Sequence, residues 1–108
     1  MKSVHISAYA DAAMEAISNW STDHFGAGQA YRYCAELLDR IDSLAQGHLT
    51  GQSCRDLIAP NLRADLRLIR AGRHAIIHVE TAQMITILDV VHLSADLTAR
   101  LTDPGPLD

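Results

Sequence analysis

The sequence contains little cysteine, few aromatic residues and almost no lysine. Its 108 residues include two cysteines, one Trp, one Phe and three Tyr, and Lys2 is the single lysine. Cys34 falls within a helical apolar pattern and is predicted to be a small core residue, whereas Cys54 is predicted to lie in a polar loop. Neither cysteine has metal-ligand spacing to a histidine or to the other cysteine. We therefore expect free thiols and no disulfide framework.

Long apolar runs, targeting segments and cofactor motifs are also missing. No apolar run approaches the ~20 residues of a membrane-spanning helix, and residues 1–6 lead into no apolar stretch like that of a secretory signal. No Gly-rich phosphate motif, nucleophile elbow or pair of catalytic carboxylates is present. His74 and His78 would share one strand face about 13 Å apart, too far for one metal ion. We expect a cytoplasmic protein with no membrane partner, metal or cofactor.

Negative charge dominates the sequence, but it is unevenly distributed. The formal net charge at pH 7 is −4, yet residues 55–73 carry five arginines and two aspartates. An acidic chain binds nucleic acid poorly, since non-specific affinity comes from neutralising phosphates, so no direct nucleic-acid binding is expected. The local arginines instead suit an acidic protein partner. The competing interpretation is a solvated strand face with scattered arginines.

Two helices are predicted in the first half of the chain. Val4–Ile6 is typical of a short strand, and Ser7 is a suitable N-cap for a helix from about residue 8 to residue 24. Residues 27–46 have the clearest apolar period of three and four, and predict a second helix. Phe25-Gly26 is predicted to end the first helix. Because the connection between the two helices is very short, they must form an antiparallel hairpin.

The second half changes from a helical period to alternation. Residues 47–62 are predicted to be a loop that contains a short turn at Asp56–Ile58. Strands are predicted at 66–70, 75–79 and 84–92, joined by tight turns as an antiparallel meander, and the third is apolar on both faces. A last helical turn is expected within 94–101. The order β-α-α-β-β-β predicts an α+β fold in which a helical hairpin is the only cover of a small antiparallel sheet.

The chain length indicates one domain. A chain of 108 residues buries roughly two-thirds of the surface that its unfolded state exposes, which is enough for one core. We assign residues 1–101 to this domain. Residues 102–108 contain Pro104, Gly105 and Pro106, and we expect them to form a frayed tail.

Several short motifs match one group of bacterial proteins. Phe25-Gly26 is followed by Gln29-Ala30, and the last predicted strand ends in an apolar residue and His92, with Asp96 shortly after. Over about residues 4–101 the chain resembles the RelE/ParE toxin superfamily of type II toxin–antitoxin modules, and most of all its ParE branch. Further matching segments are Ile17–Trp20, His24, Tyr33, Leu44-Ala45, the Gly51 region, Leu62-Arg63, Gly72–Ile77 and Ile87–Val91.

The resemblance implies both a target and a partner. ParE-like toxins inhibit DNA gyrase, serve in plasmid stabilisation, and are neutralised by a ParD-like antitoxin with which they form hetero-oligomers. The leading expectation is therefore a non-enzymatic gyrase inhibitor. Two alternatives stay open, namely a ribosome-dependent messenger-RNA endoribonuclease of the RelE type and a degenerate toxin that only binds antitoxin. Departures from the usual ParE pattern at His48, His78 and Ala95 suit the degenerate toxin.

RNA cleavage requires a base, an acid and cations around the scissile phosphate. RelE-like toxins supply these groups from Lys, Arg and a C-terminal Tyr or His. In this chain Lys2 lies at the wrong end, and no Tyr follows Tyr33. Arg73 and His92 are interpreted as a strand-end arginine and the histidine that closes the last strand, and the alternative is that they act as a phosphate clamp and a proton-transfer group. No catalytic residue is assigned.

Candidate binding residues follow from the charge pattern, the aromatic residues and the resemblance. The resemblance implies an antitoxin segment that crosses the hairpin and the sheet, and an acidic segment would meet the arginines of the basic region. The antitoxin-binding candidates are Arg63, Arg67, Arg70 and Arg73. Aromatic residues dominate interface energetics. The target-binding candidates are Trp20, Tyr31 and His92. The competing interpretation of Trp20 is a plug between the hairpin and the sheet.

Overall fold

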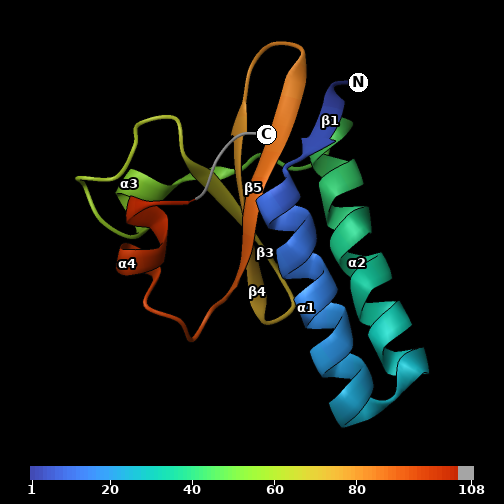
Figure 1. Ribbon diagram of the computed structural model, residues 1–108. Coiled ribbons are helices and arrows are strands. Elements are labelled where there is room, and N and C mark those ends of the chain that lie inside the picture. Colours follow the sequence, from blue (N-terminus) through green and yellow to red (C-terminus); the bar gives the residue numbers. More distant parts are fainter. Residues whose placement is uncertain (105–108) are drawn as a thin grey trace.

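Two long helices pack along one face of a five-stranded sheet in the computed structural model, which describes residues 1–104 (Figure 1). The helices are α1 (Ala8–Phe25) and α2 (Ala27–Ala45), and they run antiparallel as a hairpin. The predicted α+β fold is confirmed. No helix within the described residues is long and apolar enough to cross a membrane.

The ends of the hairpin helices follow from local side-chain and backbone chemistry. Ser7 caps α1, because its hydroxyl oxygen accepts a hydrogen bond of 3.0 Å from the backbone N–H of Ala10. Gly26 has φ +89°, a conformation that costs glycine little. This single residue ends α1 and begins α2. The predicted cap and the predicted reversal at Gly26 are therefore both confirmed.

The sheet is mostly antiparallel. In spatial order its strands are β1 (Ser3–Ile6), β5 (Met84–His92), β4 (His74–Glu80), β3 (Arg67–Ala71) and β2 (Gln52–Ser53). β1 pairs in parallel with β5, and the other neighbours are antiparallel. The meander of β3, β4 and β5 was predicted. The segment 47–62 was predicted as a loop, but it contains β2 and a short helix, α3 (Cys54–Leu57). The strand β2 escaped prediction because two residues are too few to show alternation.

A bulge in β5 changes which side chains face the hairpin. Leu88 has no partner in the β4–β5 ladder, and the register shifts between Ile77 and His78. Before the bulge, Ile87 packs into the core on the hairpin side, and after it Val90 does so. One extra residue thus moves the rest of β5 into the opposite alternation.

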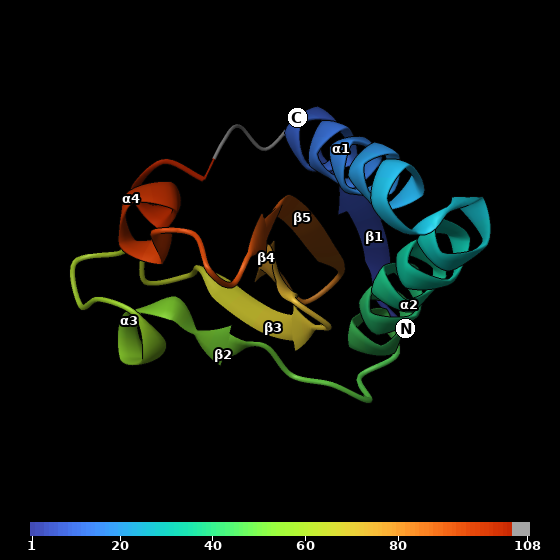
Figure 2. The ribbon, with the colours of Figure 1, turned by 90° about the horizontal axis from the view of Figure 1, so that it is seen from below.

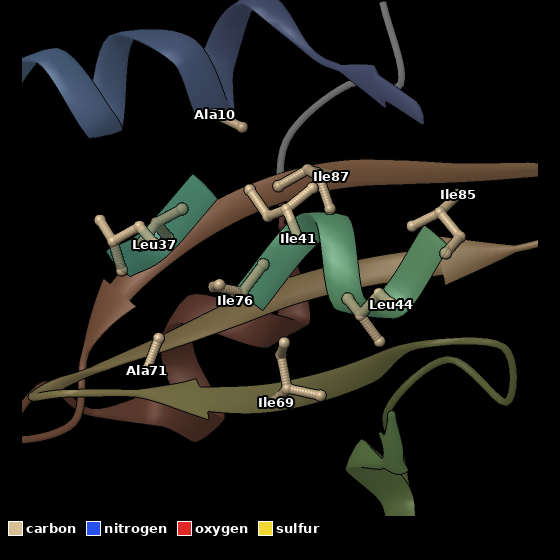
Figure 3. Packing of buried hydrophobic residues seen from close by; sticks show 10 residues of the cluster. Ala10, Leu37, Ile41, Leu44, Ile69, Ala71, Ile76, Ile85 and Ile87 are labelled. Atoms are coloured by element: carbon tan, nitrogen blue, oxygen red, sulfur yellow. The ribbon is translucent and has the colours of Figure 1, made fainter. Parts of the chain in front are cut away.

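Each face of the sheet carries its own apolar core. The hairpin-side core (Figure 3) consists of Ala10, Leu37, Ile41, Leu44, Ile69, Ala71, Ile76, Ile85, Ile87 and Val90. The far-side core consists of Cys54, Leu62, Leu66, Leu68, Ala75, Ile77, Leu88, Val91 and Leu101. Figure 2 shows α3 and α4 on the side of the sheet opposite the hairpin. The prediction that the hairpin is the only cover was therefore wrong, because both faces of the central strands are apolar and need burial.

The two cysteines have the reverse of their predicted environments. Cys54, predicted in a polar loop, is fully buried in the far-side core, and burial raises the pKa of its thiol to about 11. Cys34, predicted in the core, is only half-buried on α2. Both are free thiols. The polar neighbours of Cys54 in sequence concealed an inward-facing position at the start of α3.

An ion pair to the buried Asp89 holds α4 (Leu97–Thr102) against the far side of the sheet. Asp89 is 1% exposed, and its Oδ2 accepts a hydrogen bond of 3.0 Å from Nη2 of Arg100 in α4. A buried charge without a partner is costly, so this contact and the buried Leu101 position the helix. Asp89 follows the bulge directly, and the bulge directs its carboxylate towards α4.

The last helical turn lies close to the predicted one. It was expected within residues 94–101, and α4 begins after Asp96, whose Oδ1 accepts a hydrogen bond of 3.2 Å from the backbone N–H of Ala99. The frayed tail assigned to residues 102–108 stays a prediction. α4 extends to Thr102, and residues 105–108 lie outside the described part of the chain.

Replacement of Gly51 by Ala should destabilise the fold. A Cβ at Gly51 would overlap the imidazole of His78 and touch the side chain of Arg67. Overpacking of this kind costs about 1–3 kcal/mol. The matched control is Gly28→Ala in α2, where an added Cβ meets nothing within 4 Å among the described residues and helix propensity favours Ala. Urea denaturation should show a lower unfolding free energy for Gly51→Ala alone, and equal values for both variants would contradict the packing.

Candidate functional site

A groove of about 630 Å³ lies between the closed end of the helical hairpin, the β3–β4 turn and the end of β5. It is the candidate site, and it is called the groove below. Its lining residues are Ala16, Ile17, Trp20, Ser21, Phe25, Gln29, Tyr33, Gly72, Arg73, His74 and His92. Elements from both halves of the chain therefore build it. The lining is mainly apolar on the helix side and polar on the sheet side.

The apolar wall is formed by aromatic residues at the end of α1. Trp20 is 53% exposed and Phe25 is 55% exposed. The ring of Trp20 stacks on His24 with centroids 4.0 Å apart, and meets Phe25 edge-on at 5.6 Å. Trp20 and His24 are four residues apart, so they share one helix face. The interpretation of Trp20 as a plug is wrong, since more than half of it remains accessible.

The hydroxyl of Tyr33 connects the hairpin to the β3–β4 turn. It accepts a hydrogen bond of 3.0 Å from the backbone N–H of Arg73, and it lies 2.5 Å from Nδ1 of His74. Burial raises the pKa of Tyr33, and the hydrogen bond from Arg73 opposes this shift. Gly72 has φ +60°, and a Cβ there would come within 2.7 Å of the Tyr33 ring. Glycine therefore permits both the turn and the close approach of the tyrosine.

Two histidines face each other across the β4–β5 ladder at the sheet side of the groove. His74 pairs with His92 in register, and their ring centroids are 5.1 Å apart. Nδ1 of His92 accepts a hydrogen bond of 3.0 Å from the backbone N–H of Ser94. A backbone N–H can only donate, so the neutral imidazole of His92 carries its proton on Nε2. Burial, and then the charge of His92, lower the pKa of His74.

A family model described as the ParE toxin of the type II toxin-antitoxin system, parDE, matches residues 4–97. The chain belongs to the ParE toxin family. No curated protein matches it.

The fold agrees with a solved structure described as the chromosomal ParDE TA system from P. aeruginosa. The TM-score is 0.69 and the sequence identity is 17%, over 85% of this chain and 96% of that chain. At this identity the likeness concerns the fold alone. The predicted membership of the ParE branch is therefore confirmed by the family match, and the predicted architecture by the structural match.

The structure of this ParE-family toxin brings together only some of the candidate binding residues. Trp20 and His92, both target candidates, line the groove with Arg73, an antitoxin candidate. Tyr31, the third target candidate, is 78% exposed on α2 and does not line the groove. Phe25 also lines the groove. The sequence pattern indicated it only as part of the Phe25-Gly26 motif and not as a binding residue.

The four arginines do not form one surface. Arg63 pairs with Asp65 at 2.9 Å in the loop before β3. Nη1 of Arg67 donates a hydrogen bond of 2.6 Å to the carbonyl of Gly51. Arg67 and Arg70 are three apart on β3, and an odd separation places them on opposite faces of the strand. The assignment of these four arginines to antitoxin binding stays a prediction.

His78 and His74 share one face of β4, as their even spacing predicts, but His78 is not a polar surface residue. It is fully buried, and its Nε2 has no hydrogen-bond partner within residues 1–104. Burial lowers the pKa of His78, and the bond between its Nδ1 and the carbonyl of Ile76 opposes this shift. Gly51 lies directly against its ring, and so a glycine in the loop leaves space for the buried imidazole.

The toxin should lose stability as the pH falls from about 7.5 to about 5.5. His74 and His78 have lowered pKa values in the folded state, so below about 6.5, the usual value for His, the unfolded chain binds more protons. The stability is complete above that value and is lost as the pH falls towards the folded pKa. Urea denaturation at the two pH values measures the loss.

The variant His78→Leu isolates the contribution of the buried imidazole. It removes one of the two groups that resist protonation, and the pH-dependent loss of unfolding free energy should become smaller. His5 lies on the exposed face of β1, and His5→Leu should retain the full loss. An identical loss in wild type and His78→Leu would show that His78 does not carry this dependence.

Proposed function

We propose that this ParE-family toxin inhibits DNA gyrase by direct binding, and that a cognate ParD-like antitoxin neutralises it by direct contact in a hetero-oligomer. The observation that carries the proposal is the family match over residues 4–97. Inhibition by binding requires no catalytic group. It requires an accessible surface with anchoring side chains, and the groove offers one.

The target contact is assigned to the closed end of the hairpin. Trp20 and Phe25 expose large aromatic surfaces there, and Tyr31 adds a further exposed ring on α2. Exposed aromatic residues that cluster mark protein-binding sites, and Trp and Tyr are frequent hot spots. His92 lines the sheet side of the same groove. Gyrase would thus contact exposed aromatic side chains on the helix side of the groove and polar side chains on its sheet side.

The antitoxin contact is assigned to the basic region, and within it mainly to Arg70 and Arg73. Arg63 and Arg67 already bind groups of the toxin itself, so an acidic antitoxin segment would meet Arg70 and Arg73 with less competition. Arg70 is exposed on β3, and its carbonyl accepts two hydrogen bonds, of 2.8 and 3.1 Å, from the guanidinium of Arg40. The guanidinium of Arg40 is thereby held beside the backbone of Arg70.

One observation favours a second candidate function, messenger-RNA cleavage. Arg73, His74 and His92 line the same groove, which places a cation and two proton-transfer groups side by side. Induction of the toxin alone in growing cells separates the two functions. Cell filamentation and a DNA-damage response would indicate gyrase, whereas translation arrest with codon-specific messenger-RNA cleavage would indicate the ribonuclease.

Trp20→Ala should weaken gyrase inhibition. Truncation of an aromatic anchor typically costs about 2 kcal/mol or more in binding, so the concentration that halves gyrase supercoiling should rise on the order of tenfold or more. The measurement is a supercoiling assay with purified toxin and gyrase. The matched control is Leu38→Ala, an exposed apolar residue of α2 outside the groove. A toxin that never inhibits supercoiling would contradict the proposed target.

Arg70→Glu should slow the binding of the antitoxin. Reversal of a rim charge mainly lowers the association rate against an acidic partner, on the order of tenfold at low salt. Surface plasmon resonance with the cognate antitoxin gives this rate at several salt concentrations. Arg32→Glu applies the same change of charge on the exposed side of α2. If Arg70→Glu and Arg32→Glu bound the antitoxin alike, the assignment of Arg70 would be wrong.

A further inference from the structure

The groove has the size of a small-molecule site. Its volume of about 630 Å³ lies within the ~300–1,000 Å³ that is usual for ligand pockets. Its walls come from α1, α2, the β3–β4 turn and β5. The Tyr33 hydroxyl joins two of these walls through its contacts with Arg73 and His74. The shape is therefore set by packed elements, as in a preformed ligand site.

The charges in the groove differ from those of the whole chain. The chain has a net charge of −4, but the described residues that line the groove include no Asp or Glu. The ionisable lining residues are Tyr33, Arg73, His74 and His92. Arg73 makes no ion pair within residues 1–104. Glu36 acts electrostatically on Tyr33 without lining the groove. This arrangement favours an anionic ligand.

The hydrogen-bond donors on the sheet side are held in place by the backbone. The N–H of Arg73 donates to Tyr33, and its carbonyl accepts a hydrogen bond of 2.9 Å from the N–H of Leu93. The backbone of Arg73, from which the guanidinium side chain extends, is thus held by hydrogen bonds at its N–H and its carbonyl. His92 presents Nε2–H, because Ser94 occupies its Nδ1. A guanidinium and an imidazole N–H are suited to the oxygens of a phosphate.

The opposite wall is suited to a planar ring. Trp20 and Phe25 present accessible aromatic surface to the groove. Nucleobases stack on such side chains without regard to base identity. The amide of Gln29 also lines the groove, and it offers both a donor and an acceptor to the edge of a base. A ligand with a phosphate at one end and a flat heterocycle at the other matches both sides.

We propose that the groove binds a nucleoside monophosphate, with its phosphate at Arg73 and His92 and its base against Trp20 and Phe25. The proposal concerns binding alone, and no bond is made or broken. It goes beyond gyrase inhibition and does not depend on it. The competing occupant is an acidic peptide segment, but a groove whose walls are packed elements favours the small ligand.

Isothermal titration calorimetry on the purified full-length chain tests the proposal with AMP, GMP, CMP and UMP. At least one should bind saturably to a single site, and the matching nucleoside and inorganic phosphate should each bind at least about tenfold more weakly. Arg73→Gln should weaken nucleotide binding by at least about tenfold, since it removes the charged donor. The matched control Arg32→Gln, on the exposed side of α2, should bind like wild type.

Fluorescence gives a second readout, because Trp20 is the only tryptophan in the chain. Nucleotide stacking should quench its emission along the same binding curve. Trp20→Leu should weaken binding in calorimetry, whereas Tyr9→Leu, which replaces an exposed aromatic residue of α1 outside the groove, should not. Circular dichroism verifies that each variant is folded.

Four results would overturn the proposal. They are the absence of saturable binding by all four nucleotides, equal binding of inorganic phosphate, unchanged affinity in Arg73→Gln, and displacement of the nucleotide by an acidic hexapeptide at lower concentration. The last result would assign the groove to a protein segment. Gyrase supercoiling is measured separately, without a nucleoside monophosphate. A toxin that fails to inhibit gyrase would therefore leave the calorimetric result unaffected.

Discussion

The pairing of β4 with β5 is the constraint on which the other features depend. The single unpaired residue Leu88 shifts the register between Ile77 and His78, and it thereby decides which side chains of β5 face each core. The same ladder sets His74 opposite His92, and directs Asp89 towards Arg100. A change of one residue in this register would move the apolar set of β5 to the wrong faces. The fold, the groove and the position of α4 share this one pairing.

Much of the architecture could be predicted from the sequence because it depends on local sequence features. The cap at Ser7, the reversal at Gly26 and the change to alternation after residue 62 each depend on neighbouring residues. The misassigned features depend on distant contacts. Cys54 is polar in its sequence context but buried by the far-side core, and His78 fits only because Gly51 lies against it. Such burial is set by tertiary packing, which a local pattern does not contain.

The candidate site was predictable in part for the same reason. Trp20 and Arg73 carry signals of their own, an aromatic ring and a place in the basic region, and both line the groove. The basic region was predicted from charge density along the chain, and the alternation of β3 places Arg67 and Arg70 on opposite faces of the strand. The contact of Tyr33 with His74 joins residues of α2 and β4. Neither the spacing nor the composition of the sequence indicates it.

The parallel pairing of β1 with β5 also affects how the toxin folds. Ser3 pairs with Met84 and Ile6 with Ile87, so the first strand completes its hydrogen bonds only with the last one. Contacts so far apart in sequence slow folding, because a long loop must close before they form. The hairpin of α1 and α2 can form early during synthesis, but the groove lacks its sheet side until β5 has been made. Growing chains therefore have no complete groove. A nascent chain on the ribosome cannot yet bind a partner or ligand in the groove.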